Sequence, residues 1–213
     1  MKELIENFKP INKQETRDKE VILEYLSYFD NLLTRENNFA HFTSSAFIVN
    51  QDYTKVLMAY HNIYKSYAWL GGHMDGDTNP LKVAIKEAKE ESSISKLELI
   101  TTDIISLDAI EVTGHIKKNN WVTPHIHLNV TYLFKANDED FIHENLDENS
   151  SVKWLPIDEI DNFVTEENML VIYHKIIDKM NRIINKWKKY IKLIKEFNKH
   201  DYRLLILFNL KNN

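Results

Sequence analysis

The sequence predicts a mixed α/β domain, in which strands and helices alternate, with further helix at each end of the chain. Short runs rich in β-branched and aromatic residues, such as SAFIVN and KVLMAYH, follow one another from Phe42 onward. The pair Asn79 and Pro80 then marks the start of a helix, because Asn caps orphan backbone donors and Pro suits the first helical position. Apolar residues spaced by three and four indicate helices from Thr16 and again from Glu166.

The individual elements are expected in the following order. Periodicity predicts a helix over 16–33, strands at 45–50, 55–61 and 67–70, a helix over 80–92, strands within 97–116 and at 125–136, a short strand turning into helix over 152–160, and a mostly helical stretch from 166 to about 199. The apolar segment 203–210 fits either type of element. No internal repeat and no linker rich in Gly, Ser or Pro interrupts this order.

The composition limits which kinds of site are available. With 213 residues, of which 43% are hydrophobic, the chain can bury one sizeable core with additions. It has no run of eighteen apolar residues, and its first residues, MKELIENFKP, lack the apolar stretch of a secretory signal, so we expect a soluble, cytoplasmic protein. Because the chain has no cysteine, carboxylates, carbonyls or histidines would have to hold a metal ion, which favours hard cations.

The net charge of −5 hides an asymmetry between the body and the tail. From Lys175 onward the chain has eleven Lys or Arg against three Asp or Glu, a charge of +8, which leaves −13 (16 against 29) for the preceding part. A basic tail of this kind contacts nucleic acid, a membrane surface or its own acidic body. Its apolar stripe favours docking on the body or on a second subunit, which would give a homodimer; the stripe consists of Ile183, Ile184, Trp187, Ile191, Ile194 and Phe197.

The chemistry-bearing residues gather around one loop and the helix that follows it. Three of the four glycines lie in the stretch GGHMDGD, just before the helix that Asn79 caps. On that helix Glu87, Glu90 and Glu91 stand at positions i, i+3 and i+4, and therefore share one face. Such a run is often only a solvated acidic face, but carboxylates so close repel one another, and a divalent cation removes that conflict.

The segment GGHMDGDTNPLKVAIKEAKEESSI resembles the Nudix box, whose pattern is Gly, five residues, Glu, seven residues, then Arg-Glu-aliphatic-any-Glu-Glu-any-Gly-aliphatic. With Gly72 at the first position the register matches without a gap, and the three glutamates of the Arg-Glu-aliphatic-any-Glu-Glu run are all present. Three positions depart from the pattern. Thr78 replaces the first Glu, Lys86 replaces Arg and Ser93 replaces the second Gly.

These departures differ in consequence. Lys86 keeps the cation that orients a catalytic Glu in the family but lacks the planar fork of Arg. Ser93 stands where a glycine ends the helix, at a cost of about 0.5 to 1 kcal/mol. Thr78 removes a carboxylate that supports the loop, for which Asp75 or Asp77 lies close enough in sequence to substitute.

The resemblance covers roughly 35–171 and extends to a bacterial, MutT-like group of Nudix proteins that carry GGH and DGD. It implies the Nudix α/β/α sandwich with a mixed sheet, divided into an N-terminal helical extension (1–38), a Nudix domain (39–180) and a basic C-terminal helical tail (181–213). The tail after about Lys186 is unlike any part of the family.

By this resemblance the chain is a pyrophosphohydrolase that cleaves a phosphoanhydride bond in a nucleoside diphosphate linked to another moiety, with ADP-ribose or a nucleotide sugar as the expected type. Mg²⁺, or Mn²⁺ in its place, would be held by Glu87, Glu90, Glu91 and the carbonyl of Gly72, with Lys86 in the catalytic group. The alternatives are a catalytically degenerate Nudix module that binds nucleotides and an RNA-directed protein that uses the basic tail.

Several other residues are candidates for the site. His73, inside the glycine loop, is expected to contact substrate phosphate. Glu148, or Glu144 near it, precedes the Trp154 strand, where some Nudix enzymes place another metal ligand or a general base. His125 and His127 share one face of a strand and form a ligand pair or, without a third histidine fixed by the spacing, make ordinary hydrogen bonds.

Overall fold

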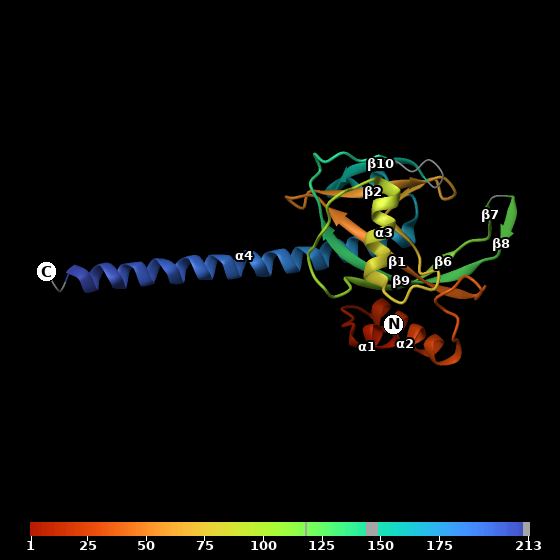
Figure 1. The fold of residues 1–213 in the computed structure, drawn as a ribbon, viewed down its shortest axis with the longest axis horizontal. Coiled ribbons are helices and arrows are strands. Elements are labelled where there is room, and N and C mark those ends of the chain that lie inside the picture. Colours follow the sequence, from red (N-terminus) through yellow and green to blue (C-terminus); the bar gives the residue numbers. More distant parts are fainter. Residues whose placement is uncertain (118, 144–148, 211–213) are drawn as a thin grey trace. The chain divides into compact units, whose positions relative to one another are not determined.

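The computed structural model describes residues 1–117, 119–143 and 149–210, without the side chains of 149 and 195–210. The chain forms two compact units, 1–173 and 174–213, and each is described by itself. The helices and strands are α1 (Lys2–Asn7), α2 (Lys13–Tyr28), β1 (Ala40–Val49), β2 (Lys55–His61), β3 (Ser66–Ala68), β4 (Leu70–His73), α3 (Pro80–Ser92), β5 (Glu98–Leu99), β6 (Ser106–Val112), β7 (His115–Lys117), β8 (Asn120–Val122), β9 (His125–Lys135), β10 (Asn149–Pro156), the 3₁₀ helix η1 (Ile157–Asn162) and α4 (Glu167–Leu210) (Figure 1).

A mixed eight-stranded sheet forms the centre of the first unit. Its main path runs β10-β2-β1-β9-β5, while β3 pairs with β2, β4 with β1 and β6 with β9. The two longest strands, β1 and β9, are parallel, with His41 opposite His127 and Ser45 opposite Thr131. The short strand β4 runs antiparallel to β1, with Ser44 opposite Gly72. The other pairs in this sheet are antiparallel as well.

One face of the sheet lies under α3, which Figure 1 shows in front of the strands. The β1 residues on this face are buried in the same core cluster as one side of α3, and α1 and α2 contribute to that cluster too. The Oγ of buried Ser44 donates to the carbonyl of Pro80 (2.7 Å), which fixes the start of α3 on β1. The cluster includes Phe42, Ala46, Ile48, Val83, Ala84, Ala88, Ile5 and Ile22.

On the opposite face of the sheet, the side chains of β1 are polar in the first half of the strand and apolar near its end. Thr43 and Ser45 on β1 both donate to the Oδ1 of Asn129 on β9 (2.8 and 2.9 Å), and all three are buried. Further along the same face, Phe47 lies 6.1 Å from Tyr173 of α4, measured between ring centroids. Helices therefore cover both faces, which confirms the predicted α/β/α arrangement.

Most of the predicted elements are present, with shifted ends. The N-terminal helix begins after Asn12, whose side chain accepts from the backbone N–H of Glu15, and ends at Tyr28, so Leu32 and Leu33 lie beyond it. The predicted strand at 67–70 is broken at Trp69 into β3 and β4, which pair with different neighbours. Residues 203–210, whose type the sequence left open, continue the backbone of α4.

Local signals fix both ends of α3. The side chain of Asn79 accepts from the backbone N–H of Lys82 (3.1 Å), with Pro80 at the first position, as predicted. The helix ends at Ser93, which has φ 58° and ψ 13°, the left-handed conformation that favours glycine. The expected strain at this departure from the family pattern is therefore present in the backbone.

In the second unit, the described part of α4 carries an exposed apolar stripe among lysines. The exposed residues are Trp187, Tyr190, Ile191, Leu193 and Ile194. Within the part of the chain that the structure describes, no helix is long and apolar enough to cross a membrane.

We expect Ser93→Gly to raise the free energy of unfolding by about 0.5 to 1 kcal/mol, because glycine adopts this φ without strain and the exposed Ser93 side chain gives up no buried contact. Urea denaturation measures the change. Ser95→Gly is the matched control, because Ser95 is exposed but has no positive φ, and it should leave stability unchanged or lower it. Equal effects of the two variants would contradict strain at Ser93.

We expect truncation after Asn185 to lower the melting temperature or to change the oligomeric state, because the removed segment carries the exposed stripe that should dock on the body or on a second copy. Calorimetry and light scattering measure the two quantities. A truncated protein with unchanged stability and mass, but with lost binding to anionic vesicles or to RNA, would contradict docking and favour the alternatives for the tail.

Candidate active site

The two adjacent glycines of β4 allow two close approaches, of α3 at Gly72 and of β1 at Gly71. A Cβ built on Gly72 would lie 2.5 Å from the Oε2 of Glu87, so the carboxylate occupies the place where any other residue would have its side chain. A Cβ on Gly71 would meet the backbone of β1, 2.6 Å from the carbonyl oxygen of Ser44. The backbone N–H of Gly71 donates to Glu91 Oε2 (3.0 Å). The loop and the helix are thus joined through two of the three predicted glutamates.

Lys86 links Glu87 to Glu90, the third of the glutamates. Its Nζ lies 3.0 Å from Glu87 Oε1 and 3.2 Å from Glu90 Oε2. These two hydrogen bonds, to Glu87 first, raise the pKa of Lys86. The Glu87 side chain is only 15% exposed whereas that of Glu90 is 55% exposed, so the site runs from the β4 interface out to solvent.

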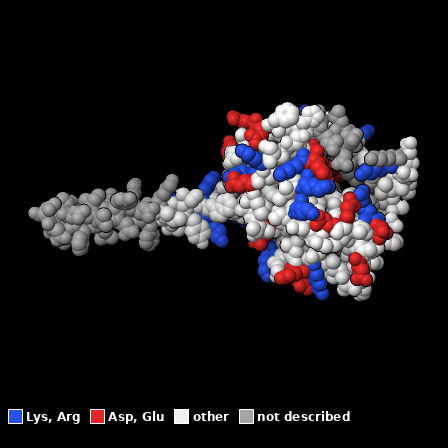
Figure 2. All heavy atoms as spheres, in the orientation of Figure 1, with Lys and Arg blue, Asp and Glu red and all other residues white. Residues whose placement is uncertain are grey.

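The four predicted residues of the box therefore lie together on one side of α3. Figure 2 shows this face of the first unit, where lysines and carboxylates adjoin. A flexible ammonium between two carboxylates stabilises them without fixing their geometry, because Lys offers a single nitrogen where Arg offers a planar fork. A divalent cation supplies the same charge with defined coordination.

The two aspartates near Thr78 each pair with a cation. Thr78 is exposed. Asp75 makes a two-fold ion pair with Arg35, at 2.8 Å to Nε and 2.7 Å to Nη2. Asp77 accepts from the Nζ of Lys82 (2.6 Å), which is the main cause of its lowered pKa. Both aspartates that could substitute for the missing Glu are thus paired with cations of their own.

A second cluster lies on the other face of the sheet. Successive residues of a strand point to opposite faces, so Gly72 faces α3 and His73 faces away from it. There the ring of His73 lies 5.0 Å from that of His41 and 4.9 Å from that of His127. The rings of His41 and His127 are 5.2 Å apart, and His125 stands beside both. One ligand nitrogen from each of His41, His73 and His127 lies within 4.8 Å of the others.

Burial keeps these imidazoles neutral. It lowers the pKa of His41, and it lowers that of His73 to about 3, with the guanidinium of Arg35 acting in the same direction. Burial, followed by the charge of His73, lowers the pKa of His127 well below its ordinary value. At neutral pH the cluster therefore offers lone pairs and N–H donors, and no positive charge.

The sequence pointed to His73 and to the pair His125 and His127, but not to His41. The missing third histidine, His41, comes from β1, because the pairing of β1 with β9 puts it directly opposite His127. This pairing joins strands more than 80 residues apart and has no local signal. The other predicted candidates, Glu144 and Glu148, lie outside the described residues.

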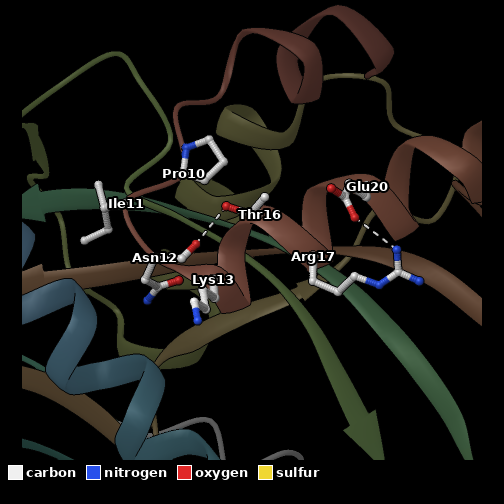
Figure 3. Close-up of a pocket in the computed structure, with 7 residues that line it drawn as sticks. All are labelled: Pro10, Ile11, Asn12, Lys13, Thr16, Arg17 and Glu20. Atoms are coloured by element: carbon white, nitrogen blue, oxygen red, sulfur yellow. Dashed lines mark hydrogen bonds and ion pairs between the residues drawn. The ribbon is translucent and has the colours of Figure 1, made fainter.

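The depression at the start of α2 belongs to neither cluster. Its lining residues all lie between Pro10 and Glu20, and two internal contacts join some of them: Thr16 Oγ1 donates to the Asn12 carbonyl (2.9 Å), and Arg17 pairs with Glu20 (3.0 Å) (Figure 3). This surface offers neither a carboxylate cluster nor a histidine.

Comparison with solved structures relates the first unit to known folds. An Ap4A hydrolase from C. elegans matches with a TM-score of 0.50 and 17% identity, over 68% of this chain and 98% of that one. A Nudix-family hydrolase from Clostridium perfringens matches at 25% identity with a TM-score of 0.47, over 66% and 97% of the two chains. The dihydroneopterin triphosphate pyrophosphohydrolase of E. coli matches at 17% identity with a TM-score of 0.49, over 68% and 95%.

At these identities the C. elegans structure supports the fold alone. No curated protein matches the chain. The model of the NUDIX domain family, however, matches residues 40–177, which contain β1, the glycine loop, α3 and the strands that follow. The narrower likeness to bacterial proteins with GGH and DGD stays a prediction. With a match over more than half of its length, the chain belongs to the Nudix hydrolase family.

Proposed function

We propose that the protein is a cytoplasmic enzyme that uses Mg²⁺ or Mn²⁺ to hydrolyse a phosphoanhydride bond. Its substrate is a nucleoside diphosphate linked to another moiety, of the ADP-ribose or nucleotide-sugar type. The observation that carries this proposal is the contact between β4 and α3, where Glu87 fills the space of the Gly72 side chain. A carboxylate that is only 15% exposed loses hydration, a cost that a bound cation offsets.

The residues present fit a hard divalent cation. Three carboxylates and a backbone carbonyl next to a glycine are oxygen donors, which Mg²⁺ prefers, and Glu90 is exposed enough to leave room for water and phosphate. We assign Glu87, Glu90, Glu91 and the Gly72 carbonyl to the metal. The bound metal would supply charge neutralisation at the phosphate oxygens and a lowered pKa for the attacking water.

The remaining steps belong to the side chains around it. Lys86 holds Glu87 and Glu90 in place and offsets their mutual repulsion until substrate binds. One of the glutamates takes the proton of the attacking water as a general base. A contact of His73 with substrate phosphate stays a prediction, and its side chain lies with His41 and His127 on the face away from α3.

One observation favours a second candidate function, a degenerate Nudix module that binds nucleotides without turnover. Thr78 leaves the box one carboxylate short, and Asp75 and Asp77 are both paired with cations. We prefer the enzyme, because the three glutamates assigned to the metal are all retained, and two of them, Glu87 and Glu91, contact β4.

We expect wild-type protein to bind Mn²⁺ saturably in calorimetric titration, and expect the triple variant Glu87→Gln, Glu90→Gln, Glu91→Gln to lose this binding because amides carry no charge for the ion. The control removes three exposed carboxylates elsewhere: Glu3→Gln, Glu20→Gln, Glu24→Gln. The proposal fails if wild type shows no saturable binding or if the control loses as much as the box variant.

We expect Glu90→Gln or Glu91→Gln to reduce kcat/KM by about two orders of magnitude or more, about 3 kcal/mol of transition-state stabilisation, on the best substrate from a screen of nucleoside diphosphate compounds. Lys86→Arg should preserve or raise turnover, because it keeps the cation and adds the fork. The exposed Lys89→Arg on the same helix is its control.

Thr78→Glu separates the two candidate functions. We expect it to change steady-state hydrolysis little at saturating magnesium, once folding of the variant has been checked, because Asp75 and Asp77 already place carboxylates in this loop. If it turns an inert protein into an active one, the natural chain is the degenerate module and the enzymatic proposal is wrong.

A further inference from the structure

Three strands bring their histidines to one point on the sheet face opposite α3. His41 is near the start of β1, His127 is opposite it on β9, and His73 ends β4. The pairing of His73 with Thr43, two residues beyond His41, puts all three side chains on the same face. Two of the three histidines thus lie on the long paired strands β1 and β9, and the third lies on β4, which pairs with β1.

The buried member of the cluster is already oriented as a ligand. His41 is 5% exposed, and its Nδ1 lies 3.0 Å from the carbonyl oxygen of Asn37. Because a carbonyl only accepts, this Nδ1 carries the proton and Nε2 carries a lone pair. That Nε2 is buried without a hydrogen-bond partner. A histidine that donates one nitrogen to a carbonyl and leaves the other free is the usual arrangement of a metal ligand.

His125 fixes the protonation of the His127 ring through a similar set of hydrogen bonds. His125 Nδ1 lies 2.8 Å from the carbonyl oxygen of Thr123, so this nitrogen carries a proton and the Nε2 of His125 accepts. Its donor is the Nε2 of His127, 3.1 Å away. In a neutral ring this leaves Nδ1 of His127 as the nitrogen with the lone pair.

We propose that His41, His73 and His127 bind a zinc ion, at a site separate from the carboxylates of α3 and with a fourth position open to water or a phosphate oxygen. Imidazole suits Zn²⁺, whereas Mg²⁺ prefers oxygen donors, so the two sites select different ions. Three histidines with an open position is a ligand set that zinc accepts.

The distances require only local movement. Zn–N bonds of about 2.0 to 2.1 Å in tetrahedral geometry place ligand nitrogens about 3.3 Å apart. The three nitrogens now lie within 4.8 Å of one another. Side-chain rotations that shorten these separations by roughly 1.5 Å bring the nitrogens to zinc-binding distance. His73 and His127 are partly exposed, which gives the ion a path from solvent.

An anion is a weaker candidate for the same place. The three rings are neutral at pH 7, because burial lowers the pKa of each. Neutral imidazoles attract phosphate weakly but need no deprotonation to bind a metal. Asp75 raises the pKa of His41 and of His73, but Arg35, its ion-pair partner, lowers both.

The test is titration of the full-length, metal-stripped protein with Co²⁺, whose visible absorption reports a nitrogen-rich, four-coordinate site, followed by competition with Zn²⁺. We expect one equivalent to produce these absorption bands, with their loss on addition of stoichiometric Zn²⁺ and no loss with millimolar Mg²⁺. The Glu87→Gln, Glu90→Gln, Glu91→Gln variant should bind equally well. This variant separates the zinc site from the proposed hydrolytic site, so either proposal can fail alone.

Single ligand variants then identify the site. His41→Asn and His73→Asn should each weaken Co²⁺ binding by about 100-fold or more, while the exposed His174→Asn should leave it unchanged. Because the buried His41→Asn protein risks misfolding, imidazole ¹⁵N resonances of wild type are followed with added Zn²⁺, and those of His41, His73 and His127 should shift together. Absent bands, bands that survive both variants, or bands lost with the three glutamates would each overturn the proposal.

Discussion

The close contact between β4 and α3 is the constraint on which the rest of the site depends. Gly72 has no side chain because the carboxylate of Glu87 takes that volume, and Gly71 has none because the backbone of β1 takes it. The N–H of Gly71 holds Glu91. Gly72 therefore sets how closely Glu87 of α3 approaches β4, and Gly71 sets how closely β4 approaches β1.

The same short strand organises the opposite face. Because side chains alternate along β4, the residue after Gly72 points away from the helix and joins a cluster of neutral imidazoles. One strand of four residues thus separates an oxygen-rich group from a nitrogen-rich one.

Patterns that act over a few residues were readable from the sequence. The box, the Asn79 cap and the i, i+3, i+4 spacing of Glu87, Glu90 and Glu91 depend on local geometry, and the structure has all three. The left-handed backbone at Ser93 followed from the family pattern as well. Features that depend on strand pairing were not readable. The role of His41 appears only when β1 lies beside β9, and the break of 67–70 into two strands appears only when β3 and β4 take different partners.

The central claim is that the space at Gly72 exists to seat a metal-binding carboxylate, and Gly72→Ala tests it directly. The added Cβ would stand 2.5 Å from Glu87 Oε2 and must displace that carboxylate. Gly76→Ala is the control, since a Cβ there meets no atom within 4 Å, and any effect comes from its φ of 89° alone. The account predicts that the Mn²⁺ dissociation constant rises about ten-fold or more in folded Gly72→Ala protein and changes little in Gly76→Ala. Unchanged Mn²⁺ affinity in Gly72→Ala would contradict it.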